Sequence, residues 1–229
     1  MKKRLISLLC AVAMIFSLLP MTVFAEEPIA VGLTVAPVLE NGTRLEALHA
    51  EDRIVATVTL PANVYSSIQL KLAFDKTRFN FYYVDTTALP AYEKGTTNPI
   101  TGESTPSTSG WTNITTPSAA DANANGYVAV GSIAYTTEDK PGNVTAENEL
   151  VVFKAYFQVL KDAPVGSATP FSILSDNREN ISINRFVDGK ETTYAVTVPE
   201  AISSTVVQEI DSVTLSGKVT TPAKGAVDE

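Results

Sequence analysis

The chain has 229 residues, a length that fits one main domain with additional segments and leaves little room for two large domains. A hydrophobic fraction of 45% excludes a disordered chain. The formal net charge of −8 argues against nucleic acid as a partner, because binding phosphates needs concentrated positive charge.

The first segment, Met1–Ala25, has the pattern of a secretory signal peptide. Three basic residues, Lys2-Lys3-Arg4, precede a long apolar run, and Val23 and Ala25 are small residues placed before a cleavage point. Without this segment the chain keeps 14 basic and 25 acidic residues, a balance of −11. We therefore expect a secreted, extracellular protein, either free or associated with the cell surface.

The mature chain is expected to contain no cysteine, because Cys10 lies within the signal segment. A disulfide and a thiolate metal site are therefore excluded. No later apolar run reaches the roughly 18 residues that a membrane span requires, so none is expected after signal removal.

In the rest of the chain, apolar and polar residues alternate within short segments rich in Val, Ile, Thr, Phe and Tyr. Pro, Gly, Asn and Asp separate these segments. Eight or nine strands without alternating helices predict an all-β fold, an antiparallel sandwich. The predicted strands are Ile29–Pro37, Arg53–Leu60, Ser67–Phe74, Phe79–Val84, Tyr127–Tyr135, Leu150–Lys161, Phe171–Leu174, Ile181–Phe186 and Tyr194–Pro199.

Two neighbouring strands indicate which side chains face a core. In Ser67–Phe74 the apolar residues alternate with Gln69, Lys71 and Ala73, which are expected on the opposite face. In the next strand Phe79, Phe81 and Tyr83 share one face, which we interpret as a core face in preference to a sugar-binding platform.

The segment Gly95–Ser118 interrupts this pattern, since 20 of its 24 residues are Gly, Ser, Thr, Pro or Asn. We expect a long functional or mobile insertion. Near its end, Trp111 lies in a stretch that resembles a short edge strand. Trp111 either plugs the end of the sandwich or offers a stacking face to a ligand.

The C-terminal residues are expected to lie outside the sandwich, which we assign to residues 26–200. Residues 201–229 are interpreted as a linker or the start of an incomplete further module, with one strand-like run at Ser212–Val219.

Residues for catalysis are few, and we do not expect an enzyme. His49 is the sole histidine and is placed in a surface loop, without a G-x-S-x-G motif to supply a nucleophile. The acidic residues flanking the predicted strands are interpreted as solvated turns and not as a glycosidase pair: Glu46, Glu51, Asp52, Glu147 and Glu149.

A weak calcium candidate occurs at Asp121, Asn123 and Asn125, followed by Gly126, which match the first six positions of the D-x-[DN]-x-[DN]-G loop. Position twelve is Ser132 where a bidentate Glu is needed. The same residues are also typical of an Asn-Gly turn before the next strand, in which Gly126 adopts a positive φ. No cofactor is therefore expected, and calcium remains the weaker reading.

The order of segments resembles the cohesin family over roughly Ile29–Pro199. The resemblance rests on four stretches: the amphipathic strand and aspartate turn of Ser66–Asp75 with Lys76–Phe79, then Gly126–Val130, then Leu150–Leu160, and the link Leu160–Ser167 leading to Pro170–Ile173. The last of these is the most specific. The resemblance implies a nine-stranded jelly-roll β-sandwich of the kind shared with carbohydrate-binding modules.

The resemblance also implies a function, since cohesins bind dockerin modules and so assemble extracellular polysaccharide-degrading complexes. In the family the partner lies across one sheet face built from the eighth, third, sixth and fifth strands. The partner-binding residues carried over to this sequence are Gln69, Lys71, Ala73, Trp111, Tyr127, Ala129 and Gly131. Small residues beside Tyr127 would let a partner helix lie close, although each position is also an ordinary solvent-facing one.

An alternative is a carbohydrate-binding or cell-surface adhesion sandwich, for which polysaccharide is the partner. Its motivation is Trp111 together with Tyr82, Tyr92 and Tyr127, which are available outside the core. A structural spacer without a ligand is a third interpretation.

Overall fold

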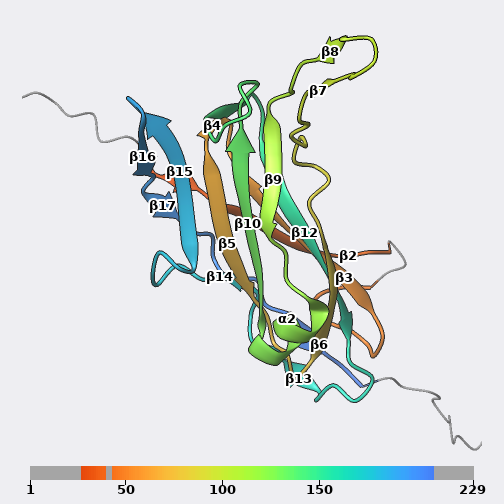
Figure 1. Ribbon diagram of the computed structural model, residues 1–229. Coiled ribbons are helices and arrows are strands. Elements are labelled where there is room, and N and C mark those ends of the chain that lie inside the picture. Colours follow the sequence, from red (N-terminus) through yellow and green to blue (C-terminus); the bar gives the residue numbers. More distant parts are fainter. Residues whose placement is uncertain (1–26, 40–42, 209–229) are drawn as a thin grey trace, which may run out of the picture.

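Two antiparallel sheets pack face to face in the computed structural model, which describes residues 27–39 and 43–208 (Figure 1). The predicted signal segment and the strand-like run Ser212–Val219 lie outside the described residues.

The first sheet has six strands in the order β16-β15-β5-β10-β9, with β14 paired to β5, and we call it the front sheet. The second has four strands in the order β2-β3-β12-β6, and we call it the back sheet. The front strands are β5 (Ser67–Ala73), β9 (Gly110–Thr115), β10 (Tyr127–Tyr135), β14 (Ser172–Ile173), β15 (Ile181–Val187) and β16 (Lys190–Thr193). The back strands are β2 (Gly32–Pro37), β3 (Arg53–Leu60), β6 (Phe79–Asp85) and β12 (Leu150–Val159).

The core forms where the inner faces of these sheets meet. Alternate residues of β5 are buried, as expected for a strand with one face in a core. The ring of Phe157 lies at the centre of an aromatic cluster, with ring centroids 4.9 Å from Phe74, 5.7 Å from Phe81 and 5.2 Å from Phe171. Each such ring pair contributes about 0.5–1.5 kcal/mol to stability beyond the area that it buries, so this cluster stabilises the packing of the two sheets.

The predicted fold class is confirmed, because each of the nine predicted segments contains a strand and the strands form two packed sheets. The first and last predicted strands also meet: β1 (Ile29–Ala30) pairs in parallel with β17 (Val196–Thr197). The remaining short strands lie at the ends of the sandwich: β4 (Asn63–Tyr65) with β11 (Val144–Ala146), and β13 (Gly166–Ser167) with β18 (Thr205–Val206).

A short helix, α2 (Ala119–Asn125), precedes β10 where the sequence predicted only a turn. Ser118 caps its N-terminus by accepting the backbone N–H of Asp121, and Gly126 ends it with the positive φ of 77° that was predicted. A helix of this length is marginal by itself, and it forms because Asn123 bonds to both backbone groups of Phe81.

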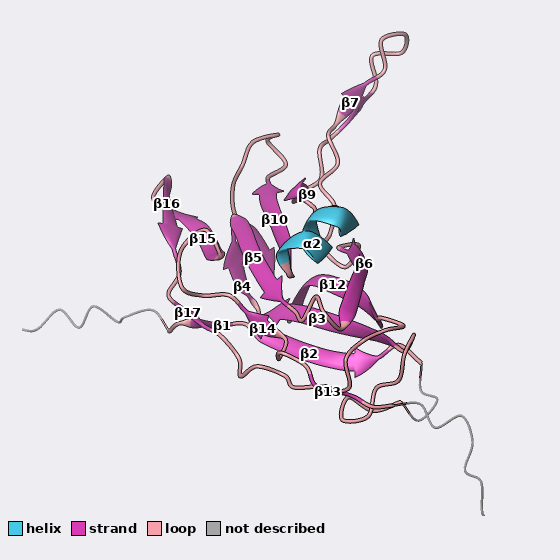
Figure 2. Ribbon diagram, turned by 90° about the horizontal axis from the view of Figure 1, so that it is seen from below, coloured by secondary structure: helices cyan, strands magenta, loops and turns pink. Residues whose placement is uncertain are grey.

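The predicted insertion contains structure of its own. Residues 93–108 form a hairpin, which we call the arm, built on β7 (Thr96–Thr97) and β8 (Ser104–Thr105), and it projects away from the sandwich (Figures 1 and 2). Ile100 at its tip is 93% exposed. The stretch around Trp111 then forms β9, the edge strand of the front sheet, as the sequence suggested.

The sandwich extends beyond the predicted boundary at residue 200. Ile202 pairs with Phe171, β18 pairs with β13, and Val206 is buried in the core. The burial of an apolar side chain explains why this segment stays on the sandwich and does not begin a linker. Residues 209–229 lie outside the described part of the chain. Among the described residues, none of the helical structure is long and apolar enough to cross a membrane.

Candidate functional site: the outer face of the front sheet

The outer face of the front sheet brings together six of the seven predicted partner-binding residues. The pairing of β5 with β10 places Ala73 opposite Tyr127, Lys71 opposite Ala129, and Gln69 opposite Gly131. Since side chains alternate along a strand, all six positions lie on the face that points away from the core.

Two of these side chains are held in place by the loop before β15. The Nζ of Lys71 donates to Oδ1 of Asn180 at 2.9 Å and lies 5.1 Å from the centroid of the Tyr127 ring. The Nε2 of Gln69 donates to the carbonyl of Glu179 at 2.7 Å. Their positions are therefore fixed in the unbound protein, which lowers the entropic cost of binding a partner.

A second polar group continues this face across β15 and β16. The Nδ2 of Asn184 donates to Oγ of Ser67 at 2.8 Å, and the Ser67 hydroxyl donates to Oε1 of Glu191 at 3.0 Å. These side-chain hydrogen bonds link β5, β15 and β16 in addition to the backbone pairing of the three strands.

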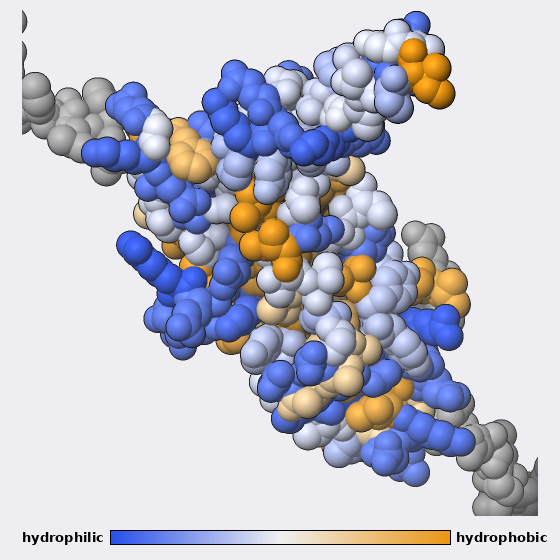
Figure 3. All heavy atoms as spheres, in the orientation of Figure 1, coloured by the Kyte–Doolittle hydropathy of each residue, from blue (hydrophilic) through white to orange (hydrophobic). Residues whose placement is uncertain are grey.

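Between these polar groups lies a hollow of about 220 Å³. Apolar side chains from three strands contribute to it, namely Ile114, Ile133 and Phe186. Ser66 also lines the hollow, and its buried Oγ has no hydrogen-bond partner among the described residues. Figure 3 shows a hydrophobic group near the middle of this face, surrounded by polar residues. The arrangement, an apolar centre within a polar rim, is typical of a protein-binding surface.

Gly131 was predicted to contact the partner, but it is buried in the structure. The pairing of β9 with β10 shifts register here and leaves Ile114 as an extra residue on β9. A Cβ at Gly131 would lie only 3.4 Å from Cγ1 of Ile114 and from Thr115. The missing side chain at Gly131 makes room for Ile114, which is 59% exposed and takes its place on the surface.

Trp111 was also predicted to contact the partner, but it is buried. It lies opposite Ala134 in the pairing of β9 with β10, faces the core and is only 6% exposed. Of the two roles considered for it, the structure shows the plug and not the contact residue. Trp111 therefore offers no exposed stacking face to a glycan.

The three residues of the weak calcium candidate lie in a helix. Asp121, Asn123 and Asn125 belong to α2 and not to a loop. Asp121 accepts the hydroxyl of Ser118, and the Asn123 amide is used in hydrogen bonds to Asn80 and Phe81. Side chains engaged in this way do not converge on one ion. Within residues 27–39 and 43–208 there is no cluster of three His, Cys, Asp or Glu side chains that could hold a metal.

His49 is exposed in a loop, as predicted, and its backbone N–H donates to Oδ2 of Asp52 at 2.8 Å. Of the acidic residues considered with it, Glu46 and Glu51 are also exposed in that loop region.

Asp75 organises the turn that follows β5. Its carboxylate accepts the backbone N–H and hydroxyl of Thr77, the Nη1 of Arg78 at 2.9 Å and the backbone N–H of Thr169 at 2.9 Å. Burial alone raises the pKa of this carboxyl, but the hydrogen bonds outweigh it and hold the pKa below its ordinary value. The charged carboxylate thus fixes the end of β5 that carries Ala73.

Several residues of this face were not predicted from the sequence: Ser67, Ile114, Ile133, Ser182, Asn184, Phe186 and Glu191. Ile133 could have been found, since it continues the two-residue period of Tyr127, Ala129 and Gly131. Ile114 could not, because its exposure depends on the irregular pairing of β9.

The chain is similar to solved structures of cohesins. The seventh ScaB type I cohesin from Pseudobacteroides cellulosolvens matches with a TM-score of 0.47 and 14% identity, over 83% of this chain and 97% of that one. A type I cohesin–dockerin complex of OlpA and Doc918 from Clostridium thermocellum gives a TM-score of 0.46 and 14% identity, over 79% and 100%. A type II cohesin domain from Acetivibrio cellulolyticus gives 0.40 and 12%, over 77% and 94%.

No protein-family model matches the chain, and no curated protein matches it. The family that the sequence pattern resembles is thus also the family of these solved structures.

Proposed function

We propose that this protein is a secreted, non-catalytic module that binds the dockerin of another protein through the outer face of its front sheet. In this role it helps assemble extracellular complexes that degrade polysaccharides. The observation that carries the proposal is the hollow bounded by Ile114, Ile133 and Phe186, on the sheet face where the sequence resemblance places a dockerin.

The chemistry of this face supports the proposal. The side chains of Ala129, within β10, and of Ala73, at the end of β5, are short, so that a partner helix can approach the backbone there. The hollow accepts one apolar side chain of the partner, Gln69 offers a fixed polar group at its edge, and Lys71 offers another further along the same face. Affinity would then come from a few buried anchors and not from many charges.

The test is a calorimetric titration of the exported chain with a panel of dockerins from the source organism. We expect at least one dockerin to bind more tightly than about 100 μM, a free energy near −5.5 kcal/mol. Ala129→Arg places a long cation in the middle of the face and is expected to weaken that binding at least about 100-fold, or about 2.7 kcal/mol.

The matched control is Thr57→Arg, which adds the same side chain to the outer face of a central strand in the back sheet. It is expected to bind the dockerin like the unmodified chain. A blank panel, or equal losses for Ala129→Arg and Thr57→Arg, would contradict the proposal.

A further inference from the structure

The outer face of the back sheet carries a second feature, which the proposed function does not use. The pairing of β12 with β6 shifts register after Tyr156: Tyr156 lies opposite Tyr83, whereas the next residue, Phe157, lies opposite Phe81. Tyr82 is therefore an extra residue in β6. The prediction that Tyr83 shares the core face of Phe79 and Phe81 is wrong, since the bulge turns Tyr83 outward.

As a result, two adjacent tyrosines meet solvent. Tyr82 is 46% exposed and Tyr83 is 54% exposed. Tyr83 stacks on Tyr156 with ring centroids 4.5 Å apart and an angle of 12° between the rings. Together with Val38, Arg53 and Phe157, the three tyrosines line a pocket of about 220 Å³, which we call the tyrosine pocket.

The size of the tyrosine pocket limits its ligand. Pockets that enclose a drug-sized molecule measure about 300–1,000 Å³. This one has room for a single ring of a ligand that continues across the sheet surface. Ala36 and Val55 extend the apolar surface away from it, because the strand pairings place them in the same row as Tyr156 and Tyr83.

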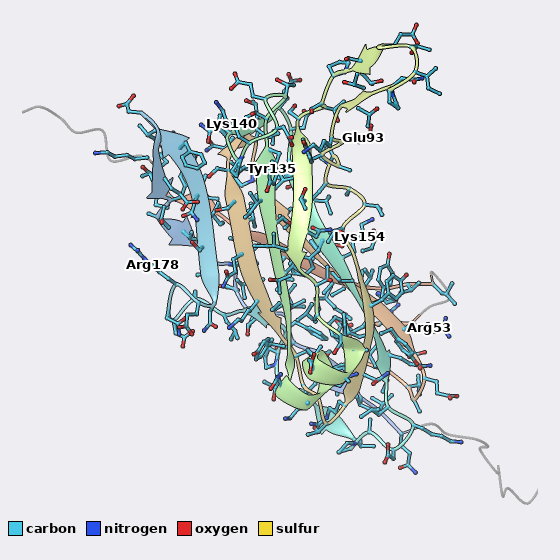
Figure 4. The ribbon with its side chains drawn as sticks, viewed as in Figure 1. Arg53, Glu93, Tyr135, Lys140, Lys154 and Arg178 are labelled. Atoms are coloured by element: carbon cyan, nitrogen blue, oxygen red, sulfur yellow. The ribbon has the colours of Figure 1, made fainter. Side chains whose placement is uncertain are left out.

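The polar groups of the pocket are arranged for hydrogen bonding. The Tyr82 hydroxyl donates to Oε1 of Gln158, and Nε2 of Gln158 donates to the carbonyl of Glu51 at 3.0 Å, so this ring is held in place. Arg53 extends into solvent from the start of β3 (Figure 4). Within the described part of the chain its guanidinium has no hydrogen bond or ion pair, and its donors are free for a ligand.

The charges near the pocket argue against an anionic ligand. Among the described residues that line it, Arg53 is the only cation, and Glu51 and Asp52 line the adjoining depression together with Arg53. A polyuronate or a nucleotide would therefore meet two carboxylates beside one guanidinium, within a chain of net charge −8.

A neutral sugar fits these features better. A pyranose ring with equatorial hydroxyls presents C–H groups on its faces, which are attracted to the negative face of an aromatic ring. Its hydroxyls at the ring edge would meet Arg53 and the Tyr82–Gln158 pair. We propose that the tyrosine pocket binds one pyranose ring of a neutral polysaccharide, on the opposite side of the molecule from the proposed dockerin face.

The test is a calorimetric titration of the exported chain with cellohexaose and with xylohexaose. We expect one of them to bind. Tyr83→Ala should weaken binding at least about tenfold, or about 1.4 kcal/mol, while Tyr83→Phe, which keeps the ring, binds normally. Arg53→Ala provides a second variant, with an expected loss of about threefold. The matched control is Tyr127→Ala, which removes a tyrosine from the front sheet and should not change sugar binding.

Three results would overturn the proposal: neither hexasaccharide binds, Tyr83→Ala binds like the unmodified chain while its circular dichroism spectrum is unchanged, or the chain sediments as a dimer that Tyr83→Ala dissociates. The last result would assign the pocket to a second copy of the chain. Dockerin titrations with Tyr83→Ala should match those of the unmodified chain, so failure here is distinguishable from failure of the proposed dockerin binding.

Discussion

Asp75 and Thr169 lie 94 residues apart in the sequence, and the carboxylate of Asp75 accepts the backbone N–H of Thr169 at 2.9 Å. The same carboxylate binds Arg78 and Thr77. One buried charge thus joins the turn between β5 and β6 to the segment between β13 and β14, beneath the end of the proposed dockerin face.

Removing this charge is expected to destabilise the fold. Asp75→Asn should lower the free energy of unfolding by about 2–4 kcal/mol, because Arg78 and two backbone donors lose a charged acceptor in a buried site. Denaturant unfolding measures the loss. Asp162→Asn changes an exposed aspartate and should stay within about 0.5 kcal/mol of the unmodified chain, so an equal effect of the two substitutions would refute this role of Asp75.

The contribution of Asp75 should also depend on pH. Its folded pKa is below the ordinary value of 3.8, because the hydrogen bonds outweigh the effect of burial. The stabilisation is therefore fully present above that ordinary value and is lost as pH falls through the folded pKa. Melting temperatures of the unmodified chain and Asp75→Asn should differ most near neutral pH and converge in acid. A constant difference across this range would contradict the assignment.

Trp111 should behave as a core residue. Its emission is expected to be blue-shifted and to move to the red on unfolding, which is readily measured because it is the only tryptophan. Trp111→Ala should cost about 3–5 kcal/mol of stability. Tyr83→Ala, in a half-exposed site, should cost much less, and a similar cost for the two would argue against the buried position of Trp111.

The arm should be dispensable for folding. Tyr92 and Lys94 at its base both contact Asp139, with Lys94 Nζ at 2.7 Å, and Glu93 lies at the same end of the sheet as Tyr135 (Figure 4). Replacing residues 95–106 with Asn-Gly closes the hairpin with a two-residue turn. The free energy of unfolding should change by less than about 1 kcal/mol, since the removed residues bury little surface. A larger loss by denaturant unfolding would show that the arm supports the sandwich.

The alternation of apolar and polar residues was sufficient to predict the strands and the outward position of Gln69, Lys71, Tyr127 and Ala129. It could not predict where a strand carries an extra residue. Bulges at Tyr82 and at Ile114 reverse the local alternation, and these two bulges account for the wrong placement of Tyr83 and for the unexpected cover over Gly131.

Tertiary contacts explain the other differences. The residues of α2 have no helical period, and the helix depends on the hydrogen bonds between Asn123 and β6. The segment beyond residue 200 is too short and irregular in its alternation to predict a strand of the sandwich, yet burial of Val206 and pairing with β13 keep it there. Neither contact leaves a local pattern in the sequence.

The central claim, that a dockerin covers the outer face of the front sheet, is tested most directly by methyl nuclear magnetic resonance spectra of the chain with and without a bound dockerin. We predict that the methyl signals of Ala129, Ile114 and Ile133 shift strongly, while those of Ala36 and Val55 on the back sheet stay in place. Shifts confined to the back sheet, or the absence of any shift at saturating dockerin, would contradict the account.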